Sequence, residues 1–391
     1  MIRRPAFNRR LAACAVLAMA AFSLAACMPP EVPPGLKLKP SSYAALPGWG
    51  EDSLEGVLPA FLRSCQVITK RQADEPVGNP GANGEALGGV VSDWQMPCAA
   101  AREIGPAAGS DEVRAFFERW FVPFMAEDDR GKPGMFTGYY EAEIDATRSR
   151  DAVHRYPLYA APKQSTNLTR AEIEAGGLTG QNLEFLWLKD PVDAFFLQIQ
   201  GSGVVRLKEG GEIRVGYAGN NGHGFVAIGK VMIEEGIIDR SAASMQTIRA
   251  WLRANPDKAQ AMMNRNPRFI FFREVKEGPV GAMGVVLTAG RSLAVDPGFV
   301  PLGLPLWLDT AWPIDHEAAK RGDPLRRLML AQDTGSAIKG PVRGDFFWGS
   351  GEEALRFAGA MKSPGNWFLL LPVTAAARKT LDVVDIVSNL K

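Results

Sequence analysis

Histidine and cysteine are scarce in this chain, which carries only 3 and 4 of them among 391 residues. The histidines have no partners at the spacing of metal ligands, and two cysteines without a neighbouring histidine cannot complete a tetrahedral zinc site. We therefore predict no metal site. No motif in the chain indicates a cofactor, so none is predicted either.

Concentrated positive charge is missing from the body of the chain. The formal net charge is +1, but Arg3, Arg4, Arg9 and Arg10 lie in an N-terminal segment that holds no acidic residue. Without that segment, 40 basic residues stand against 43 acidic ones, and no basic stripe remains. This charge pattern argues against nucleic acid as a partner.

The chain also has no apolar run long enough to span a membrane. Its 16-residue apolar segment at 11–26, which follows four arginines, has the length of a signal-peptide core. The segment ends in Leu24-Ala25-Ala26-Cys27, which resembles the bacterial lipobox and predicts cleavage before Cys27 and lipid attachment to its thiol. Met28 rather than Asp follows, which favours the outer membrane, facing the periplasm. The alternative is an ordinary Ala-x-Ala cleavage site beside an incidental cysteine.

Two cysteines remain once Cys14 leaves with the signal peptide at 1–26 and Cys27 carries lipid. Cys65 and Cys98 would then lie in an oxidising compartment, where a disulfide between them is the economical interpretation. Two buried free thiols are the alternative. Residues 27–48 are rich in proline and are predicted to form an extended tether.

Helical periodicity is clearest in two N-terminal segments. Capping-box spacing at Asp52–Glu55 precedes apolar residues that recur at helical intervals as far as Cys65, and a second helix follows Ser110. We expect a loop over 70–93, a capped turn at Thr169-x-x-Glu172, and amphipathic helices around 225–235 and 244–263. Phe195–Gln200 alternates polar and apolar residues before Gly201-Ser202-Gly203, which predicts a strand entering a hairpin.

From Phe269 onward, short apolar segments are separated by Gly- and Pro-rich turns. We expect strands at 285–288, 304–308, 328–332 and 368–371. Short strands at this spacing are typical of a small barrel.

Two aspartates in this region have the setting of acid–base residues. Asp333 ends an apolar strand at a Gly-rich turn, and Asp345 precedes Phe346, Phe347 and Trp348. Apolar surroundings disfavour the ionised carboxylate and raise its pKa towards neutral pH. The alternative is that both aspartates cap turns, as Asp in a Gly-rich loop usually does.

A third aspartate, Asp296, precedes a turn in a similar context, and here the chain resembles the membrane-bound lytic murein transglycosylase A family. The family's C-terminal module is named for three aspartates in such settings. The resembling motifs occur in order over most of the chain, and they are Leu46–Trp49, Gly138-Tyr139-Tyr140, Gln198–Gly203, Gly224–Lys230, Asn266-Pro267 and the aspartate module.

The resemblance implies a mainly β fold with flanking helices, in which a double-psi β-barrel carries an inserted second β-rich domain. The barrel would comprise 49–140 and 269–391, and the inserted glycan-binding domain 141–268. The family cleaves the β-1,4 bond between N-acetylmuramic acid and N-acetylglucosamine of peptidoglycan and leaves a 1,6-anhydro ring. The family's catalytic acid falls on Asp345, while Asp333 and Asp296 are predicted to support the loops or contact sugar.

Sugar binding requires aromatic platforms and amide or hydroxyl groups. Candidates are Tyr139, Tyr140, Gln198, Gln200 and Ser202, although a tyrosine in an apolar strand more commonly belongs to the core. The expected partners are peptidoglycan strands and, through the lipid anchor, a membrane. The cell-wall synthesis and division machinery is a further candidate partner.

Three other interpretations remain open. Asp333-Thr334-Gly335-Ser336 resembles the aspartic-protease signature, but no second copy occurs in the chain to share the proton. A peptidoglycan-binding lipoprotein without activity would not need an acid at Asp345. A muramidase of the same specificity would use Asp333 as the base that activates water.

Overall fold

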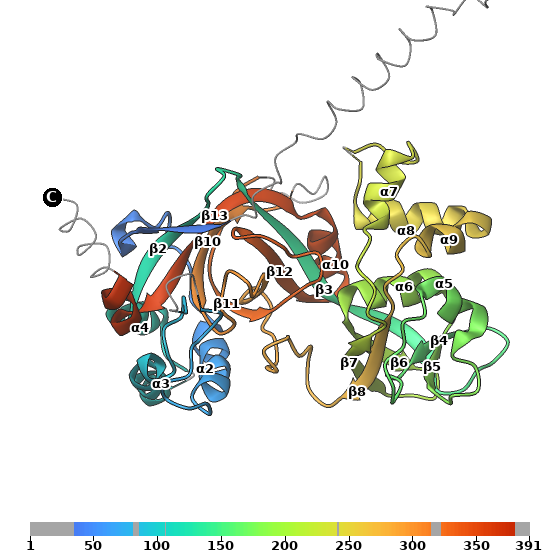
Figure 1. Cartoon of the computed structure of the whole chain (residues 1–391), viewed down its shortest axis with the longest axis horizontal. Helices are drawn as coiled ribbons and strands as arrows, with labels where there is room; N and C mark the ends of the chain where they lie inside the picture. Colours follow the sequence, from blue (N-terminus) through green and yellow to red (C-terminus); the bar gives the residue numbers. More distant parts are fainter. Residues whose placement is uncertain (1–34, 81–85, 106, 241, 314–321, 380–391) are drawn as a thin grey trace, which may run out of the picture. The chain divides into compact units, whose positions relative to one another are not determined.

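The computed structural model describes residues 35–80, 86–105, 107–240, 242–313 and 322–379. From Leu36 onward the chain forms one compact unit dominated by β-structure (Figure 1). Its strands are β1 Leu36–Pro40, β2 Phe121–Asp128, β3 Gly134–Thr147, β4 Tyr156–Tyr159, β5 Glu184–Leu188, β6 Ser202–Leu207, β7 Glu212–Asn220, β8 Ile270–Val275, β9 Ser292–Val295, β10 Pro305–Ala311, β11 Pro324–Asp333, β12 Arg343–Ser350 and β13 Lys362–Pro372. Its helices are η1 Tyr43–Ala45, α2 Val57–Ile68, α3 Ser92–Ile104, α4 Ser110–Trp120, α5 Arg170–Glu172, η2 Ile173–Gly177, α6 Pro191–Gln200, α7 Ile228–Glu234, α8 Met245–Ala254, α9 Pro256–Met263 and α10 Gly351–Ala360.

Six of the strands pair in a closed circuit. The pairing runs β13–β10–β11–β9–β12–β3, and β3 pairs with β13 again to complete the circuit. Most of these pairs are antiparallel, but β12 runs parallel to β3 and β11 runs parallel to β9. The predicted sheet-rich fold with flanking helices is confirmed. The strands predicted at 328–332 and 368–371 lie within β11 and β13, and the one predicted at 304–308 starts one residue before β10.

Strand β3 is long enough to serve two regions of the molecule. Its first half pairs with β12 and β13 in the closed circuit, whereas Ala142–Ala146 pairs with β6 and continues that sheet through β7 to β8. Side chains alternate between the two faces of a strand. Tyr140, Ala142, Ile144 and Ala146 accordingly enter one apolar cluster, which leaves Thr137, Tyr139 and Glu141 on the other face.

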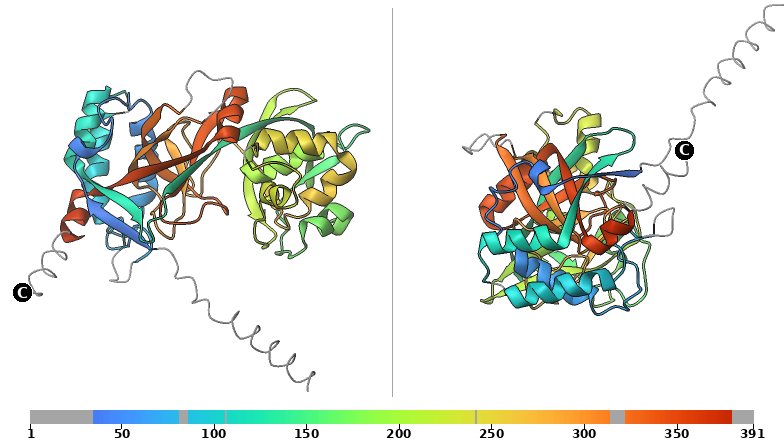
Figure 2. Two further views of the ribbon diagram at one scale, coloured as in Figure 1. Left: turned by 90° about the horizontal axis from the view of Figure 1, so that it is seen from above. Right: turned by 90° about the vertical axis from the view of Figure 1, so that its left-hand side faces the viewer.

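The largest apolar core lies between the closed circuit and helices α2, α3 and α4, which gather at one end of the strands (Figure 2). Phe61 of α2 contacts the rings of Trp94, Phe116, Phe117 and Phe121 at centroid distances of 5.6 to 6.4 Å. Aromatic residues at helical spacing therefore form core, and the helix predicted after Ser110 is present as α4.

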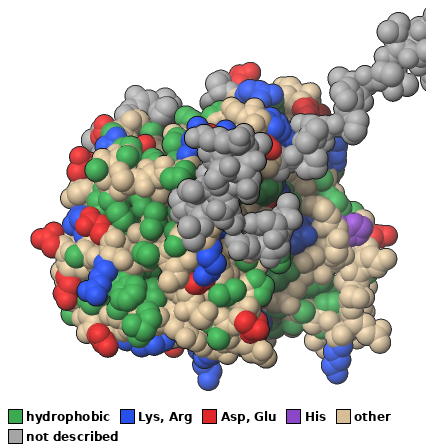
Figure 3. All heavy atoms as spheres, turned by 60° about the vertical axis from the view of Figure 1, so that its left-hand side comes forward, with side chains coloured by type: hydrophobic (Ala, Val, Ile, Leu, Met, Phe, Trp, Pro, Cys, Tyr) green, Lys and Arg blue, Asp and Glu red, His purple; other side chains and the backbone are tan. Residues whose placement is uncertain are grey.

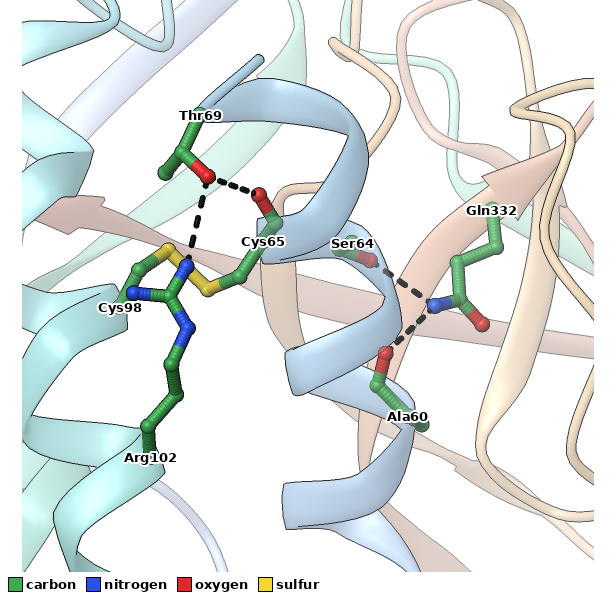
Figure 4. Close-up of a disulfide and its surroundings, with 7 residues drawn as sticks. All are labelled: Ala60, Ser64, Cys65, Thr69, Cys98, Arg102 and Gln332. Carbon is green, nitrogen blue, oxygen red and sulfur yellow. Dashed lines mark hydrogen bonds between the residues drawn. A yellow bond between two sulfur atoms is a disulfide. The ribbon is translucent and has the colours of Figure 1, made fainter.

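A disulfide joins Cys65 of α2 to Cys98 of α3 (Figure 4). Both cysteines are fully buried, and the Cα atoms are 5.6 Å apart. The opposite side of α2 is fastened to the strands, because the side-chain amide of Gln332 donates to Ala60 O at 2.8 Å and to Ser64 Oγ at 2.9 Å. The disulfide and these hydrogen bonds together hold the helical layer against β11.

The prediction of a strand at Phe195–Gln200 is wrong, because these residues form the second half of helix α6. Asp190 caps the helix by accepting from Val192 N at 2.8 Å, and Pro191 at the first helical position fixes φ. Gly201, with φ 82°, ends the helix in the left-handed conformation that glycine tolerates. The local capping signals outweigh the alternating pattern.

The start of the first helix also differs from the prediction. The helix begins at Val57 rather than at the capping-box spacing of Asp52, because Asp52 has another partner. Its carboxylate accepts from Arg291 Nη1 at 2.6 Å and Nη2 at 2.8 Å, and both side chains are buried. An ion pair between distant residues has replaced a local cap.

Smaller corrections concern five other segments. Residues 285–288 contain no regular strand, because Val286 forms only an isolated bridge with Val280. The helix predicted over 244–263 is two helices, since Pro256 begins a new one. Helices α3 and α10 were not predicted, and Ser92–Asp93 of the expected loop belongs to α3. Part of the proline-rich segment 27–48 forms β1 and pairs with β2, while Cys27 and the signal peptide lie outside the described residues.

Within the described ranges, no helix has both the length and the apolar character needed to cross a membrane. On the face shown in Figure 3, Lys and Arg side chains are interspersed with Asp and Glu. The capping box predicted at Thr169 and Glu172 is present at the start of α5.

Candidate active site

Asp345 lies on β12, one of the six strands of the closed circuit. Its neighbours are β3 on one side, where Asp345 lies opposite Thr137, and β9 on the other, where it lies opposite Ala294. Asp333 ends β11, which pairs with β9 so that Asp333 also lies opposite Ala294. Strands β11 and β12 therefore bring two aspartates, which are 12 positions apart in the sequence, to either side of the short strand β9.

The carboxyl group of Asp345 has one described hydrogen bond, in which Thr137 Oγ1 donates to Oδ1. Burial raises its pKa above the ordinary value, and it outweighs the charge of Arg343 and the Thr137 hydrogen bond, which both act in the opposite direction. The residue itself remains partly accessible to solvent. Asp345 is therefore a partly accessible carboxyl group that holds its proton more tightly than an ordinary aspartate.

The apolar surroundings differ in detail from the sequence-based expectation. Strand alternation places Phe346 in the main core, whereas Phe347 joins Tyr139, Leu287 and Ala294 in a small separate cluster. The rings of Tyr139 and Phe347 are 5.1 Å apart. Only one residue of the Phe346–Trp348 run thus belongs to the apolar cluster beside the aspartates.

Asp333 is held by three hydrogen bonds. Its Oδ1 accepts from Ala282 N at 2.8 Å and Thr334 N at 2.9 Å, and its Oδ2 accepts from Tyr139 Oη at 3.0 Å. Burial raises its pKa to about 6, although these three hydrogen bonds favour the ionised form. The charge of Asp345 contributes a smaller increase to this pKa, so the two carboxyl groups interact electrostatically.

Asp296 connects two loops through hydrogen bonds to their backbone N–H groups. Its Oδ1 accepts from Gly298 N at 3.1 Å and its Oδ2 accepts from Gly340 N at 3.0 Å. Lys339 Nζ lies 3.7 Å from Oδ1 but its side chain is largely exposed. Gly340 belongs to the segment between Asp333 and Asp345, so Asp296 fixes the course of that segment.

The five sugar-binding candidates fall in two places: Tyr139 contacts Asp333, whereas the other four lie on the opposite face of β3, on α6 or at the start of β6. Tyr139 is on the same side of β3 as Thr137, with its hydroxyl on Asp333, while Tyr140 points to the other side and its hydroxyl accepts from Arg249 Nη1 at 3.3 Å. Gln198 is buried, and its Oε1 accepts from Arg170 Nη2 at 2.8 Å. Gln200 and Ser202 are partly accessible where α6 passes into β6, and Gln200 Oε1 accepts from Tyr140 N at 3.1 Å.

Two residues of the site were not selected from the sequence. Thr137 precedes Gly138-Tyr139-Tyr140, and Arg343 stands two positions before Asp345, but threonine and arginine in these positions carry no signal of their own. Only the pairing of β12 with β3 brings them together, because Asp345 lies opposite Thr137. The period-2 alternation of a strand could have placed Arg343 on the same face as Asp345, provided β12 had been predicted.

Hollows in the described part of the molecule include two that are not lined by Asp296, Asp333 or Asp345. One of about 330 Å³ lies beside Gly89 and Ala375, and one of about 120 Å³ lies beside Asp145 and Asp193. No group of three metal-ligating side chains occurs among the described residues. The carboxyl groups of Asp345 and Asp333, whose pKa values are both raised by burial, can donate and accept protons.

The chain is similar in sequence to known proteins. The sequence matches the MltA specific insert domain over residues 135–273 and the 3D domain over residues 291–371. It is 34% identical over 236 residues to membrane-bound lytic murein transglycosylase A of Vibrio cholerae, which covers 59% of this chain and 64% of that protein. The aligned part thus spans less than two thirds of the relative's length.

Solved structures match over a larger share of the chain. A membrane-bound lytic murein transglycosylase from Agrobacterium tumefaciens has 34% identity and a TM-score of 0.76, covering 88% of this chain and 99% of its own. Escherichia coli MltA with bound chitohexaose has 26% identity and a TM-score of 0.65, covering 87% and 95%. The closed strand circuit and its three aspartates therefore define a sheet-rich protein of the kind represented by these structures. The chain belongs to the MltA family, as its ordered motifs predict.

Proposed function

We propose that this protein is a lytic transglycosylase that cleaves the β-1,4 bond between N-acetylmuramic acid and N-acetylglucosamine in peptidoglycan. The observation that carries the proposal is the state of Asp345, a partly accessible carboxyl group whose pKa is raised by burial. A general acid must hold its proton at the working pH, and this environment favours the protonated form. The names of the relatives supply the class of substrate.

One carboxyl group is sufficient for the reaction. Asp345 donates its proton to the glycosidic oxygen as the bond from that oxygen to the anomeric carbon breaks. The 6-hydroxyl of the same muramyl residue then attacks the anomeric carbon, and its proton passes to the Asp345 carboxylate. Because the nucleophile belongs to the substrate, its effective concentration is very high and no water needs activation. The product carries a 1,6-anhydro ring, and Asp345 returns to its protonated state.

The alternative is a hydrolase in which Asp333 activates water, and its raised pKa of about 6 favours that candidate. The contacts of Asp333 argue against it. Both carboxylate oxygens already accept hydrogen bonds, from two backbone N–H groups and from the hydroxyl of Tyr139. These hydrogen bonds stabilise the ionised carboxylate and so weaken it as a base for water. We therefore assign Asp333 to holding Tyr139 and the following loop, and Asp296 to holding the segment that leads to Asp345.

The glycan contacts proposed from the sequence are Tyr139, Tyr140, Gln198, Gln200 and Ser202. Chitohexaose bound to the Escherichia coli relative supports an extended site for a sugar chain. Among these five residues, Gln200 and Ser202 are both partly accessible, and they lie at the junction of α6 and β6. Gln198 would act through its neighbours, because Arg170 and Ile270 N already occupy its side-chain oxygen.

The finer features of architecture and location belong to the same proposal. We assign the closed circuit to the double-psi β-barrel class, with 49–140 and 269–391 as the barrel domain and 141–268 as the insertion. The lipobox-like sequence before Cys27 supports a lipid anchor on an outer membrane, with the enzyme facing the periplasm. The membrane-bound relatives agree with membrane association.

The proposal is tested by digesting purified peptidoglycan with the protein lacking residues 1–26 and weighing the muropeptides by mass spectrometry. We expect products lighter by one water than those of a muramidase, because the anhydro ring replaces the hydrated end. Hydrated products would identify a two-carboxylate hydrolase. Binding to peptidoglycan without any product would identify a non-catalytic lipoprotein.

A further inference from the structure

Arg343 lies two positions before Asp345 on β12, on the same face of the strand. Its Nη2 donates to Thr137 Oγ1 at 2.8 Å, and its Nη1 donates to Met135 O at 3.3 Å and to Gly344 O. Thr137 in turn donates to Asp345 Oδ1. Two strands that are paired in parallel, β3 and β12, hold all of these groups. Among the described residues no hydrogen bond joins the guanidinium group directly to Asp345, and the hydrogen-bonded path between them runs through the hydroxyl of Thr137.

The direction of both hydrogen bonds follows from the chemistry of arginine. A guanidinium group has only donors, so the oxygen of Thr137 must be the acceptor in its bond with Arg343. The hydroxyl hydrogen of Thr137 is then directed to Asp345 Oδ1. A protonated carboxyl group accepts better at its carbonyl-type oxygen than at its hydroxyl oxygen. The proton of Asp345 therefore belongs on Oδ2, which accepts no hydrogen bond from any described residue.

We propose that Arg343, acting through Thr137, is a positioning residue that keeps the transferable proton of Asp345 on Oδ2 and stabilises the carboxylate formed when that proton is donated. This inference rests on the proposed role of Asp345 as the general acid. Arg343 supplies a fixed positive charge at a distance set by one intervening hydroxyl. The arrangement would hold Oδ2 in a constant orientation while the carboxyl group alternates between its two protonation states.

Other ionisable groups near Asp345 act in different directions. Asp333, from β11, and Tyr139, from β3, both interact with the charge of Asp345, whereas Arg343 and Thr137 favour the ionised carboxyl group and lower its pKa. Removing Arg343 or Thr137 should therefore raise the pKa of Asp345 further. Because Asp345 acts as an acid, the alkaline limb of the pH–rate profile should move to higher pH.

The decisive variants are Thr137→Val, which keeps the side-chain shape but removes the hydroxyl, and Arg343→Met, which keeps an unbranched side chain but removes the donors. Each should lower kcat about 10- to 100-fold, the effect of losing a hydrogen bond to a charged group, with KM changed less than about twofold. The double variant should be no slower than the slower single variant, because both residues act in one chain of hydrogen bonds.

Conservative variants separate this role from a merely structural one. Thr137→Ser should keep most of the activity and the pH profile of the parent protein, and Arg343→Lys should restore part of the rate. Arg71→Met is the matched control, since Arg71 pairs with Glu75 in an exposed ion pair. Thermal melting of each variant shows whether the fold is intact. A Thr137→Ser protein as slow as Thr137→Val would overturn the proposal.

A titration independent of turnover completes the test. The ¹³C signal of the Asp345 carboxyl carbon, assigned by comparison with Asp345→Asn, should titrate at higher pH in Arg343→Met and Thr137→Val than in the parent protein. If both variants fold and the Asp345 titration is unchanged, Arg343 and Thr137 do not act on Asp345 as proposed, even if the enzyme is active. If the titration shifts as expected but the parent protein releases no anhydro product, the proposed action of Arg343 and Thr137 on Asp345 is supported and the proposed reaction is rejected.

Discussion

Two clusters of buried polar groups in this molecule are satisfied to different degrees. Beside α6, Arg170 donates to Asn266 O at 3.1 Å, to Gln198 Oε1 at 2.8 Å and to Arg268 O at 2.7 Å, and its guanidinium lies 4.7 Å from the Phe195 ring centroid. At β12, the carboxyl group of Asp345 has a single hydroxyl partner among the described residues. The Arg170 cluster is saturated, because its guanidinium group has several hydrogen-bond partners, and it is suited to a structural role. The Asp345 cluster is incompletely satisfied, because Oδ2 has no partner among the described residues and stays available for proton transfer.

The largest effect should come from the incompletely satisfied cluster. Asp345→Asn removes the transferable proton but keeps the size of the side chain, so we expect turnover of peptidoglycan to fall at least about 1,000-fold. Binding to insoluble peptidoglycan should be retained, because the proposed glycan contacts are unchanged. Muropeptide release and a sedimentation assay measure the two properties. Activity within tenfold of the parent protein would remove Asp345 from the role of acid.

Breaking the saturated cluster should affect stability instead. Arg170→Met would remove one donor from each of three acceptors, although Gln198 Oε1 would keep Ile270 N. It would also remove the cation–π contacts with Phe195 and Phe269, and the free energy of unfolding should fall by about 4 kcal/mol. Urea unfolding measures this loss. Any decrease in turnover below the melting temperature should be small compared with that of Asp345→Asn. A stable variant with abolished turnover would place Arg170 in the active site.

The disulfide provides a third comparison, because it lies far from both clusters in the sequence and constrains the unfolded chain. Cys65 and Cys98 are 33 positions apart, and closing a loop of this length should stabilise the fold by about 3 kcal/mol. The Cys65→Ala/Cys98→Ala protein and the reduced parent protein should both melt at a lower temperature. Addition of reductant should not shift the melting temperature of the double variant, which serves as its own control.

The smallest effect concerns the pH dependence of stability. Burial raises the pKa of Asp333 from an ordinary value near 4 to about 6, so the folded state binds the proton more tightly than the unfolded state. Stability should therefore decrease as the pH rises between about 4 and 6, by about 2 kcal/mol after allowing for partial exposure. Asp333→Asn should lack this part of the slope in urea unfolding measured at several pH values. An equal slope in both proteins would contradict the raised pKa.

The sequence was sufficient for features that depend on short-range physics or on ordered motifs. The capping box at Thr169 and the apolar strand ending at Asp333 could be predicted because capping and alternation act over a few residues. The family followed from motifs spread along the chain. The same local reasoning failed at Phe195–Gln200, where two patterns competed and the helix caps at Asp190 and Gly201 prevailed.

Tertiary structure alone decided which residues surround the acid. Thr137 and Arg343 are separated by 206 positions and meet only because β12 pairs in parallel with β3. Asp52 likewise does not cap the following helix but pairs with Arg291, 239 positions away, because a buried guanidinium needs an anionic partner. The amino-acid sequence thus determined the type of chemistry through its aspartates, and long-range strand pairing determined the environment that adjusts their proton affinity.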